Sequence, residues 1–141
     1  MSGASPRRHA LRRLDLIGLP YRLGAEPDRH LAADCLTLSR YVLGTYGIGT
    51  PHAERSWYRR LRKGDYSIFR EQLELWGTPT DDIKVGTVAL CKAENGVGLA
   101  TFIDDFPGWL NFRGTEVVWS PHEALSIEAL YCPGNNRYAT R

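Results

Sequence analysis

The segment Ala33-Asp34-Cys35-Leu36-Thr37-Leu38 decides the fold, because it opens an apolar block that predicts a helix over residues 36–43. This helix places Cys35 at its N-terminal edge. Unpaired backbone N–H groups and the positive end of the helix dipole favour a thiolate there, and the same amides can hold an oxyanion. A cysteine beside leucines is more often core packing than a nucleophile, so both interpretations stay open on composition alone.

Helical patterns also precede and follow this segment. Residues 1–6 are small and polar and are expected to be loose, while the apolar spacing from Arg7 to Ile17 predicts an N-terminal helix that ends at Gly18 and Pro20. Residues 53–76 read as two short helices separated at Gly64-Asp65, forming a basic insertion. Its cations are Arg55, Arg59, Arg60, Arg62 and Lys63.

From residue 82 the pattern changes to strands. Short β-rich runs cover residues 87–91, 97–103, 109–112, 115–119 and 127–131. Asn95-Gly96 is a hairpin signal, and Ser120-Pro121-His122-Glu123 has the form of a helix start. Helices followed by an antiparallel sheet make an α+β fold. The expected core comprises Ala10, Leu14, Ile17, Leu38, Val42, Val88, Leu90, Leu99 and Val118.

Composition limits the possible classes of protein. The 141 residues, 43% hydrophobic and 24% charged, fit one globular domain spanning 1–141. A net charge of +2 is too even for a dedicated nucleic-acid binder. Three scattered cysteines, with no CxxC pair, predict neither a disulfide framework nor a metal site, and no cofactor is expected. Without an export signal or a long apolar run, we expect a soluble protein that does not enter a membrane.

Residues 16–48 resemble the NlpC-type cell-wall peptidases. The run Leu16–Gly24 is similar to the family's L-G-x-P-Y-x-x-G-G segment, Asp34–Leu38 to its D-C-S-G-L segment, and Gly47-Ile48 to its closing G-I. Residues 83–90 and 97–99 extend the resemblance more weakly, to about 110 residues in all. It implies a papain-like fold with N-terminal helices packed on a C-terminal antiparallel sheet.

The resemblance also implies roles for single residues. The nucleophile position falls on Cys35, with Asp34 before it and Tyr21 lining the pocket as substrate-binding positions, and the third polar position falls most nearly on Asn111. The family's histidine position is Gly96, which has no side chain to take a proton. Thr37 stands where the family has glycine. Only His30 or His52 is placed to act as a displaced base.

Three hypotheses follow. In the first, the chain is a catalytically degenerate NlpC-like domain that serves as a structural or assembly module, by analogy in a phage tail tip or baseplate. Its partners are then other tail or baseplate proteins and peptidoglycan, and it resides in the virion or, before assembly, in the host cytoplasm. In the second it is an active cysteine endopeptidase cleaving peptidoglycan stem peptides with a displaced histidine. In the third it is a basic binding module with Cys35 in the core.

The basic insertion adds an interface prediction. We expect Arg55, Arg59, Arg60 and Arg62 to dock an acidic partner surface, because arginine is enriched at protein interfaces. The alternative is a solvated helical hairpin.

Overall fold

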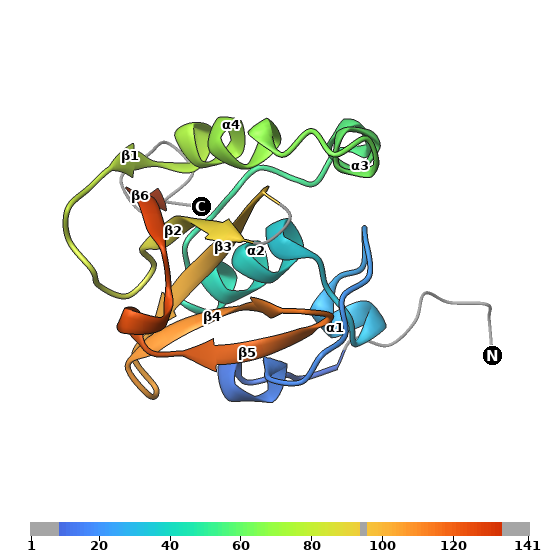
Figure 1. The fold of residues 1–141 in the computed structure, drawn as a ribbon. Coiled ribbons are helices and arrows are strands. Elements are labelled where there is room, and N and C mark those ends of the chain that lie inside the picture. Colours follow the sequence, from blue (N-terminus) through green and yellow to red (C-terminus); the bar gives the residue numbers. More distant parts are fainter. Residues whose placement is uncertain (1–8, 94–95, 134–141) are drawn as a thin grey trace.

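Six strands form one antiparallel sheet in the computed structural model, which describes residues 9–93 and 96–133 (Figure 1). The strands are β1 (Thr78–Pro79), β2 (Val88–Ala93), β3 (Gly96–Ile103), β4 (Gly108–Arg113), β5 (Glu116–Ser120) and β6 (Ile127–Cys132). Their order is β1-β6-β2-β3-β4-β5, so the last strand of the chain lies between the first two. The predicted α+β class and antiparallel sheet are confirmed, and β1 is a strand that the sequence pattern does not predict.

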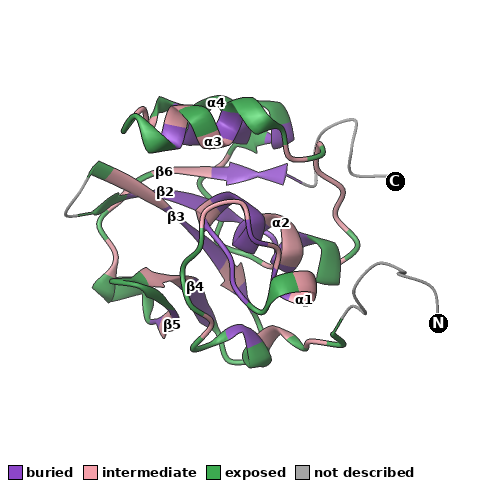
Figure 2. Ribbon diagram, turned by 90° about the vertical axis from the view of Figure 1, so that its right-hand side faces the viewer, coloured by how far each residue is buried: buried purple, intermediate pink, exposed green. Residues whose placement is uncertain are grey.

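The helices are α1 (Pro27–His30), α2 (Cys35–Thr45), α3 (Arg55–Arg62) and α4 (Ser67–Trp76), with short 3-10 turns η1 (Arg13–Leu16) and η2 (His122–Ala124). Figure 2 shows α2 in the middle of the molecule, with α3 and α4 on one side and β4 and β5 on the other. The two helices predicted for residues 53–76 are therefore present, and Gly64 separates them with a φ of 77°. Cys35 is the first residue of α2, as predicted.

Side chains from α2, α3 and α4 pack together against one face of the sheet. The cluster is apolar and includes Leu36, Trp57, Leu61, Phe69, Leu73, Trp76, Leu90 and Leu99. A second cluster on the same face joins Leu38 and Val42 of α2 to Leu110 of β4. The hydroxyl of Thr101 donates to Ser39 Oγ at 2.8 Å and fixes α2 on β3. A separate cluster containing Trp109 and Ala100 lies on the opposite face of the sheet.

The N-terminal helix predicted from Arg7 to Ile17 is wrong within the described residues. Residues 13–16 form η1, and the side chain that it buries is Leu16, whereas Ala10 is exposed and Leu14 and Ile17 are 45% and 44% exposed. After η1 the backbone is hydrogen-bonded to the edge strand β5 and does not continue as a helix. Gly18 donates its N–H to Val117 O at 2.8 Å, which fixes residues 18–21 along β5.

Two smaller predictions also need correction. Val118 is half-buried, and its neighbour Val117 is the residue with no exposed surface, because side chains alternate along β5. The helix start predicted at Ser120 is the short turn η2, which begins after Pro121. The remaining core predictions, namely Leu38, Val42, Val88, Leu90 and Leu99, are confirmed. Residues 1–6 and Asn95 lie outside the described residues.

Candidate functional site

Asp34 caps the helix that carries Cys35. Its Oδ1 accepts the backbone N–H of Thr37 at 2.9 Å, while Thr37 Oγ1 accepts the N–H of Asp34 at 2.8 Å. Asp34 Oδ2 accepts the N–H of Gly24 at 2.8 Å, and the aspartate has no exposed surface. A buried carboxylate with both oxygens occupied does not contact a substrate. The predicted substrate-binding role of Asp34 is corrected to that of an N-cap, which positions Cys35.

Tyr21 lies beside Cys35, as the resemblance implies. Ala33 donates its N–H to Pro20 O at 3.1 Å and Arg22 donates to Ala33 O at 2.9 Å, so the residues on either side of Tyr21 are held against the start of α2. Burial raises the pKa of Tyr21, and the proximity of Cys35 and Asp34 raises it further. Tyr21 is still 43% exposed, and its ring packs edge-on against Phe112 with centroids 5.1 Å apart.

The Cys35 thiol is neutral at physiological pH. The residue is half-buried and packs against the apolar cluster that contains Leu36 and Leu99. Burial raises the pKa of Cys35 to about 12, and a backbone hydrogen bond from Leu99 offsets only part of that rise. At pH 7 such a group is thiolate in about one molecule in 10⁵. The helix N-terminus therefore does not by itself activate this cysteine.

An aromatic ring stands over the position where the family has its histidine. Gly96 opens β3 with a φ of 130°, a conformation that residues with a side chain rarely adopt. A Cβ placed on Gly96 would lie 3.0 Å from Cδ2 of Tyr66, the residue that precedes α4. Gly96 therefore has no side chain that could act as a base. It is exposed, and a side chain at this position is opposed by the positive φ and by a tight contact with the Tyr66 ring.

Two of the clefts on the described part of the chain lie near this region, and Cys35 lines neither of these two. The first, about 260 Å³, lies over Gly96, and its walls are Tyr66, Ser67, Arg70, Leu90, Val97 and Glu128. The second, about 420 Å³, lies between α1 and α2 and is lined by residues that include Glu26, Arg40 and Tyr41. Neither cleft contains a histidine, so neither joins the thiol to a proton acceptor of that kind.

Asn111 lies on the opposite face of the sheet from α2. Leu110 packs against α2 and Trp109 packs on the other face, and side chains alternate along β4. Asn111 therefore shares the face of Trp109, and its Oδ1 is buried with no hydrogen bond to a described residue. The assignment of Asn111 as the third catalytic residue is wrong, because the sheet itself separates it from Cys35.

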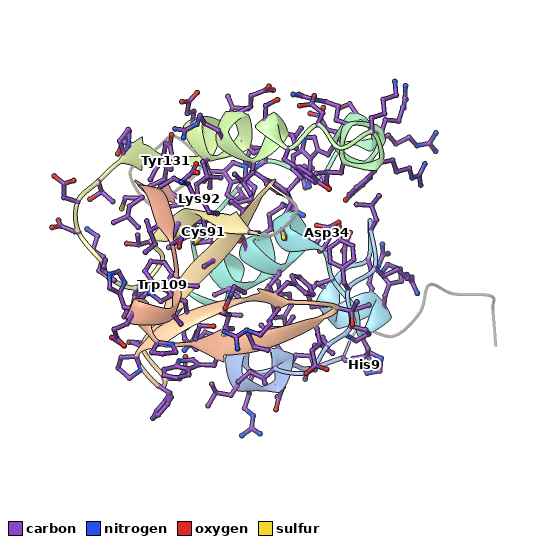
Figure 3. All side chains as sticks on the ribbon, in the orientation of Figure 1. His9, Asp34, Cys91, Lys92, Trp109 and Tyr131 are labelled. Carbon is purple, nitrogen blue, oxygen red and sulfur yellow. The ribbon has the colours of Figure 1, made fainter. Side chains whose placement is uncertain are left out.

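None of the four histidines forms a hydrogen bond with Cys35 in the described structure. His30 Nδ1 accepts the N–H of Glu26 at 2.9 Å within α1, so its ring is held by its own helix. His52 is exposed in the loop before α3, and His122 lies beside Trp109. Figure 3 shows His9 well away from Asp34 at the start of α2.

The predicted interface arginines divide into two groups. Arg55, Arg59 and Arg62 are exposed and form no ion pair with a described residue. Arg60 instead pairs with Asp65 at 2.8 Å and with Glu71 at 2.6 Å, and it also donates to Ser67 Oγ at 3.0 Å. Arg60 is therefore a brace between α3 and α4 and is removed from the predicted docking set.

The sequence analysis missed two tyrosines near the Cys35 site. The ring of Tyr66 lies against Gly96. The ring of Tyr58 of α3 lies against Gly24, where a Cβ would be 3.9 Å from that ring. Burial raises the pKa of Tyr58 to about 12, and nearby Asp34 adds to the rise. No local pattern marks either residue, because both reach this site only through the packing of the α3–α4 hairpin.

Comparisons with protein-family models, with curated proteins and with solved structures find no match to this chain. Among residues 9–93 and 96–133, no three His, Cys, Asp or Glu side chains gather in a way that could hold a metal ion. Within the same ranges, every helix is too short or too polar to span a lipid bilayer. At the start of α2, Cys35 is a half-buried thiol beside Tyr21.

Proposed function

We propose that this chain is a papain-like domain of the NlpC type that has lost peptidase activity and serves as a structural module in a protein assembly. Two features support the papain-like assignment. A cysteine opens a helix that packs on an antiparallel sheet, and a tyrosine lies beside it, as the resemblance of residues 16–48 implies. The order of helices before strands agrees with the same fold.

The observation that carries the proposal is the contact between Gly96 and Tyr66. A cysteine peptidase needs an imidazole within hydrogen-bond reach of its thiol. Here the expected position has no side chain, and a Cβ placed there would lie 3.0 Å from the ring of Tyr66. A histidine at this position would need that ring to shift by a few tenths of an ångström and would strain the backbone at a φ of 130°.

The neutral thiol supports the same conclusion. With a pKa near 12, Cys35 offers almost no thiolate at pH 7, and Asp34 is committed to capping α2. What the segment retains is a structural function, since its polar groups hold the start of α2 and the loop at Gly24. A tail tip or baseplate of a phage is the setting we propose for the module, and that part rests on the resemblance.

Turnover of peptidoglycan fragments tests the loss of activity. The natural chain, Cys35→Ala and the double variant Gly96→His/Tyr66→Ala are incubated with muropeptides, and new amino termini are counted by mass spectrometry. We expect no cleavage by the natural chain. Cleavage by the natural chain that disappears in Cys35→Ala would overturn the proposal and make His30 or His52 the candidate base.

Alkylation of the thiol provides a second test. Iodoacetamide should modify Cys35 slowly at pH 7, and the rate should rise about tenfold per pH unit up to pH 10, because the thiolate fraction rises in that proportion. Peptide mapping separates Cys35 from the buried Cys91 and Cys132. A rate that reaches its plateau below pH 8 would indicate an activated nucleophile and contradict the proposal.

A further inference from the structure

The outer face of α3 carries three arginines in a line, which we call the arginine stripe: Arg55, Arg59 and Arg62. They are spaced at i, i+4 and i+7, so they share one side of the helix and span about 10 Å along its axis. All three are exposed, and none pairs with a carboxylate of the described residues. Lys63, also exposed, follows directly at the C-terminal end of the same helix.

The fourth arginine of α3, Arg60, forms ion pairs within the α3–α4 hairpin. Arg60 donates to Asp65, to Ser67 and to both oxygens of Glu71, at distances from 2.6 to 3.0 Å. These contacts are internal and fix the turn between α3 and α4. The stripe takes no part in them. Its positive charge is therefore not used to stabilise the described part of the fold.

The stripe is also presented on a rigid support. Trp57 and Leu61 anchor the inner side of α3 in the core, with 2% and 8% of their surface exposed, and Tyr58 packs against Gly24. Arg60 ties the helix to α4. A helix held on three sides does not lose backbone freedom when a partner binds, and that lowers the entropic cost of association.

We propose that the arginine stripe binds an acidic segment of a partner protein, with carboxylates that repeat along about 10 Å. This inference rests on the proposed function of the chain as an assembly module and names the chemistry of its partner. Carboxylates on one face of a helix, at i, i+4 and i+7, match the stripe in spacing and are opposite in charge.

A protein segment fits this surface better than a nucleic acid. The stripe is short, and the acidic Glu54 directly precedes α3. A phosphate backbone that continued past the N-terminal end of α3 would meet this carboxylate, whereas a compact acidic segment can end within the stripe. The net charge of +2 also lacks the broad excess that phosphate binding uses.

Titration monitored by NMR tests the inference on the whole chain. The probe is a synthetic helical peptide with glutamates at i, i+4 and i+7, and its matched control has glutamines at those positions. We expect the glutamate peptide to shift signals of α3, including the arginine Nε–H groups, and the glutamine peptide to leave them unchanged. Raising the salt from about 50 mM to about 300 mM should weaken binding roughly tenfold, because exposed charge pairs are screened.

Charge reversal assigns the effect to the stripe. Arg55→Glu/Arg59→Glu should weaken binding of the glutamate peptide at least about tenfold. The control Lys84→Glu/Lys92→Glu changes the net charge equally at two exposed lysines outside α3 and should bind as the natural chain does. Equal weakening by both variants, or no shift of α3 with the natural chain, would overturn the inference. So would tighter binding of a short DNA duplex to the stripe than of the glutamate peptide.

The result separates this inference from the proposed function. If the peptide fails to bind while the natural chain leaves muropeptides intact, only the inference about the stripe is wrong. If the natural chain cleaves muropeptides in a Cys35-dependent way, the proposed function is wrong, whatever the titration gives.

Discussion

The two halves of the expected peptidase site differ in how much of the family pattern they keep. At the start of α2, Asp34 and Cys35 occupy the positions that the resemblance assigns, and Tyr21 lies beside them. At the start of β3, Gly96 occupies the position that the resemblance assigns to the base, and the ring of Tyr66 lies against it. Asn111, assigned to the third position, faces away on the other side of the sheet.

The difference follows from what each half does for the fold. The carboxylate of Asp34 satisfies backbone N–H groups of Thr37 and Gly24, so losing it would leave buried donors without partners. Gly96 has no side chain and therefore makes no such contribution to the fold, and the ring of Tyr66 lies against it. The polar groups of the first half are held in place by structural contacts, and the second half has no equivalent.

The largest expected effect is loss of the cap. Asp34→Ala should lower the free energy of unfolding by about 3 kcal/mol, because it removes the helix N-cap and leaves the N–H groups of buried Thr37 and half-buried Gly24 without their acceptor. Urea denaturation followed by circular dichroism measures the change. Asp34→Asn keeps one acceptor and should lose less, and Asp82→Ala, at an exposed aspartate, should stay within about 0.5 kcal/mol of the natural chain.

A small loss of unfolding free energy in Asp34→Ala would contradict the structural explanation for Asp34. If that variant unfolded within about 0.5 kcal/mol of the natural chain, Asp34 would not be held in place by the stability of the fold. Its presence before Cys35 would then need another explanation, and catalysis would be the first to examine.

A smaller effect is expected at the other half of the site. Gly96→Ala should cost about 2 kcal/mol, because a residue with a Cβ is strained at a φ of 130° and would contact the Tyr66 ring. Gly98→Ala is the matched control on the same strand, with open space around it, and should cost less than half as much. Thermal or urea denaturation compares the two variants.

Measuring Gly96→Ala in a Tyr66→Ala background separates the cost of the contact with the Tyr66 ring from the cost of backbone strain. If the ring covers Gly96 as described, Gly96→Ala should cost less in Tyr66→Ala than in the natural chain, by about 0.5 kcal/mol or more. Equal costs in the two backgrounds would show that only backbone strain opposes a side chain at position 96, and the ring would no longer count as a barrier to a base.

The first half of the site could be predicted from the sequence because its signals are local. An aspartate followed three residues later by a threonine indicates a helix start, and the cap forms between these two residues, Asp34 and Thr37. The second half could not. Tyr66 and Gly96 are 30 positions apart, and their contact depends on how the whole α3–α4 hairpin lies on the sheet.

The errors in the fold have the same physical origin. The N-terminal apolar spacing fits a helix, but backbone pairing of residues 18–21 with β5 outweighs it, and that pairing is a long-range contact. Adjacent valines at 117 and 118 carry no sign of which one faces the helices. Alternation alone places Asn111 with Trp109, yet only the packed structure tells which face of β4 meets α2.

The smallest expected effect concerns Arg60, whose ion pairs link α3 to α4 and help to hold Tyr66 against Gly96. Hydrogen bonds from Ser67 and Arg60 keep the pKa of Asp65 below its ordinary value, and the Arg60 hydrogen bond does the same for Glu71. Carboxyl groups with a lowered pKa in the folded state contribute stability at neutral pH, and that stability is lost as the pH falls below about 4.5.

Arg60→Gln should therefore lower the melting temperature at pH 7 by only a few degrees, since exposed ion pairs are weak. The difference from the natural chain should shrink as the pH falls from 7 to 3, because protonation of Asp65 and Glu71 removes the ion pairs. Arg59→Gln, which removes an arginine without an ion-pair partner among the described residues, should match the natural chain at both pH values. Hydrogen exchange should also quicken at Tyr66 and Gly96 in Arg60→Gln at pH 7. If the difference in melting temperature persists unchanged at pH 3, Arg60 does not stabilise the fold through these ion pairs. The position of Tyr66 against Gly96 then depends on the packing of α3 and α4 alone.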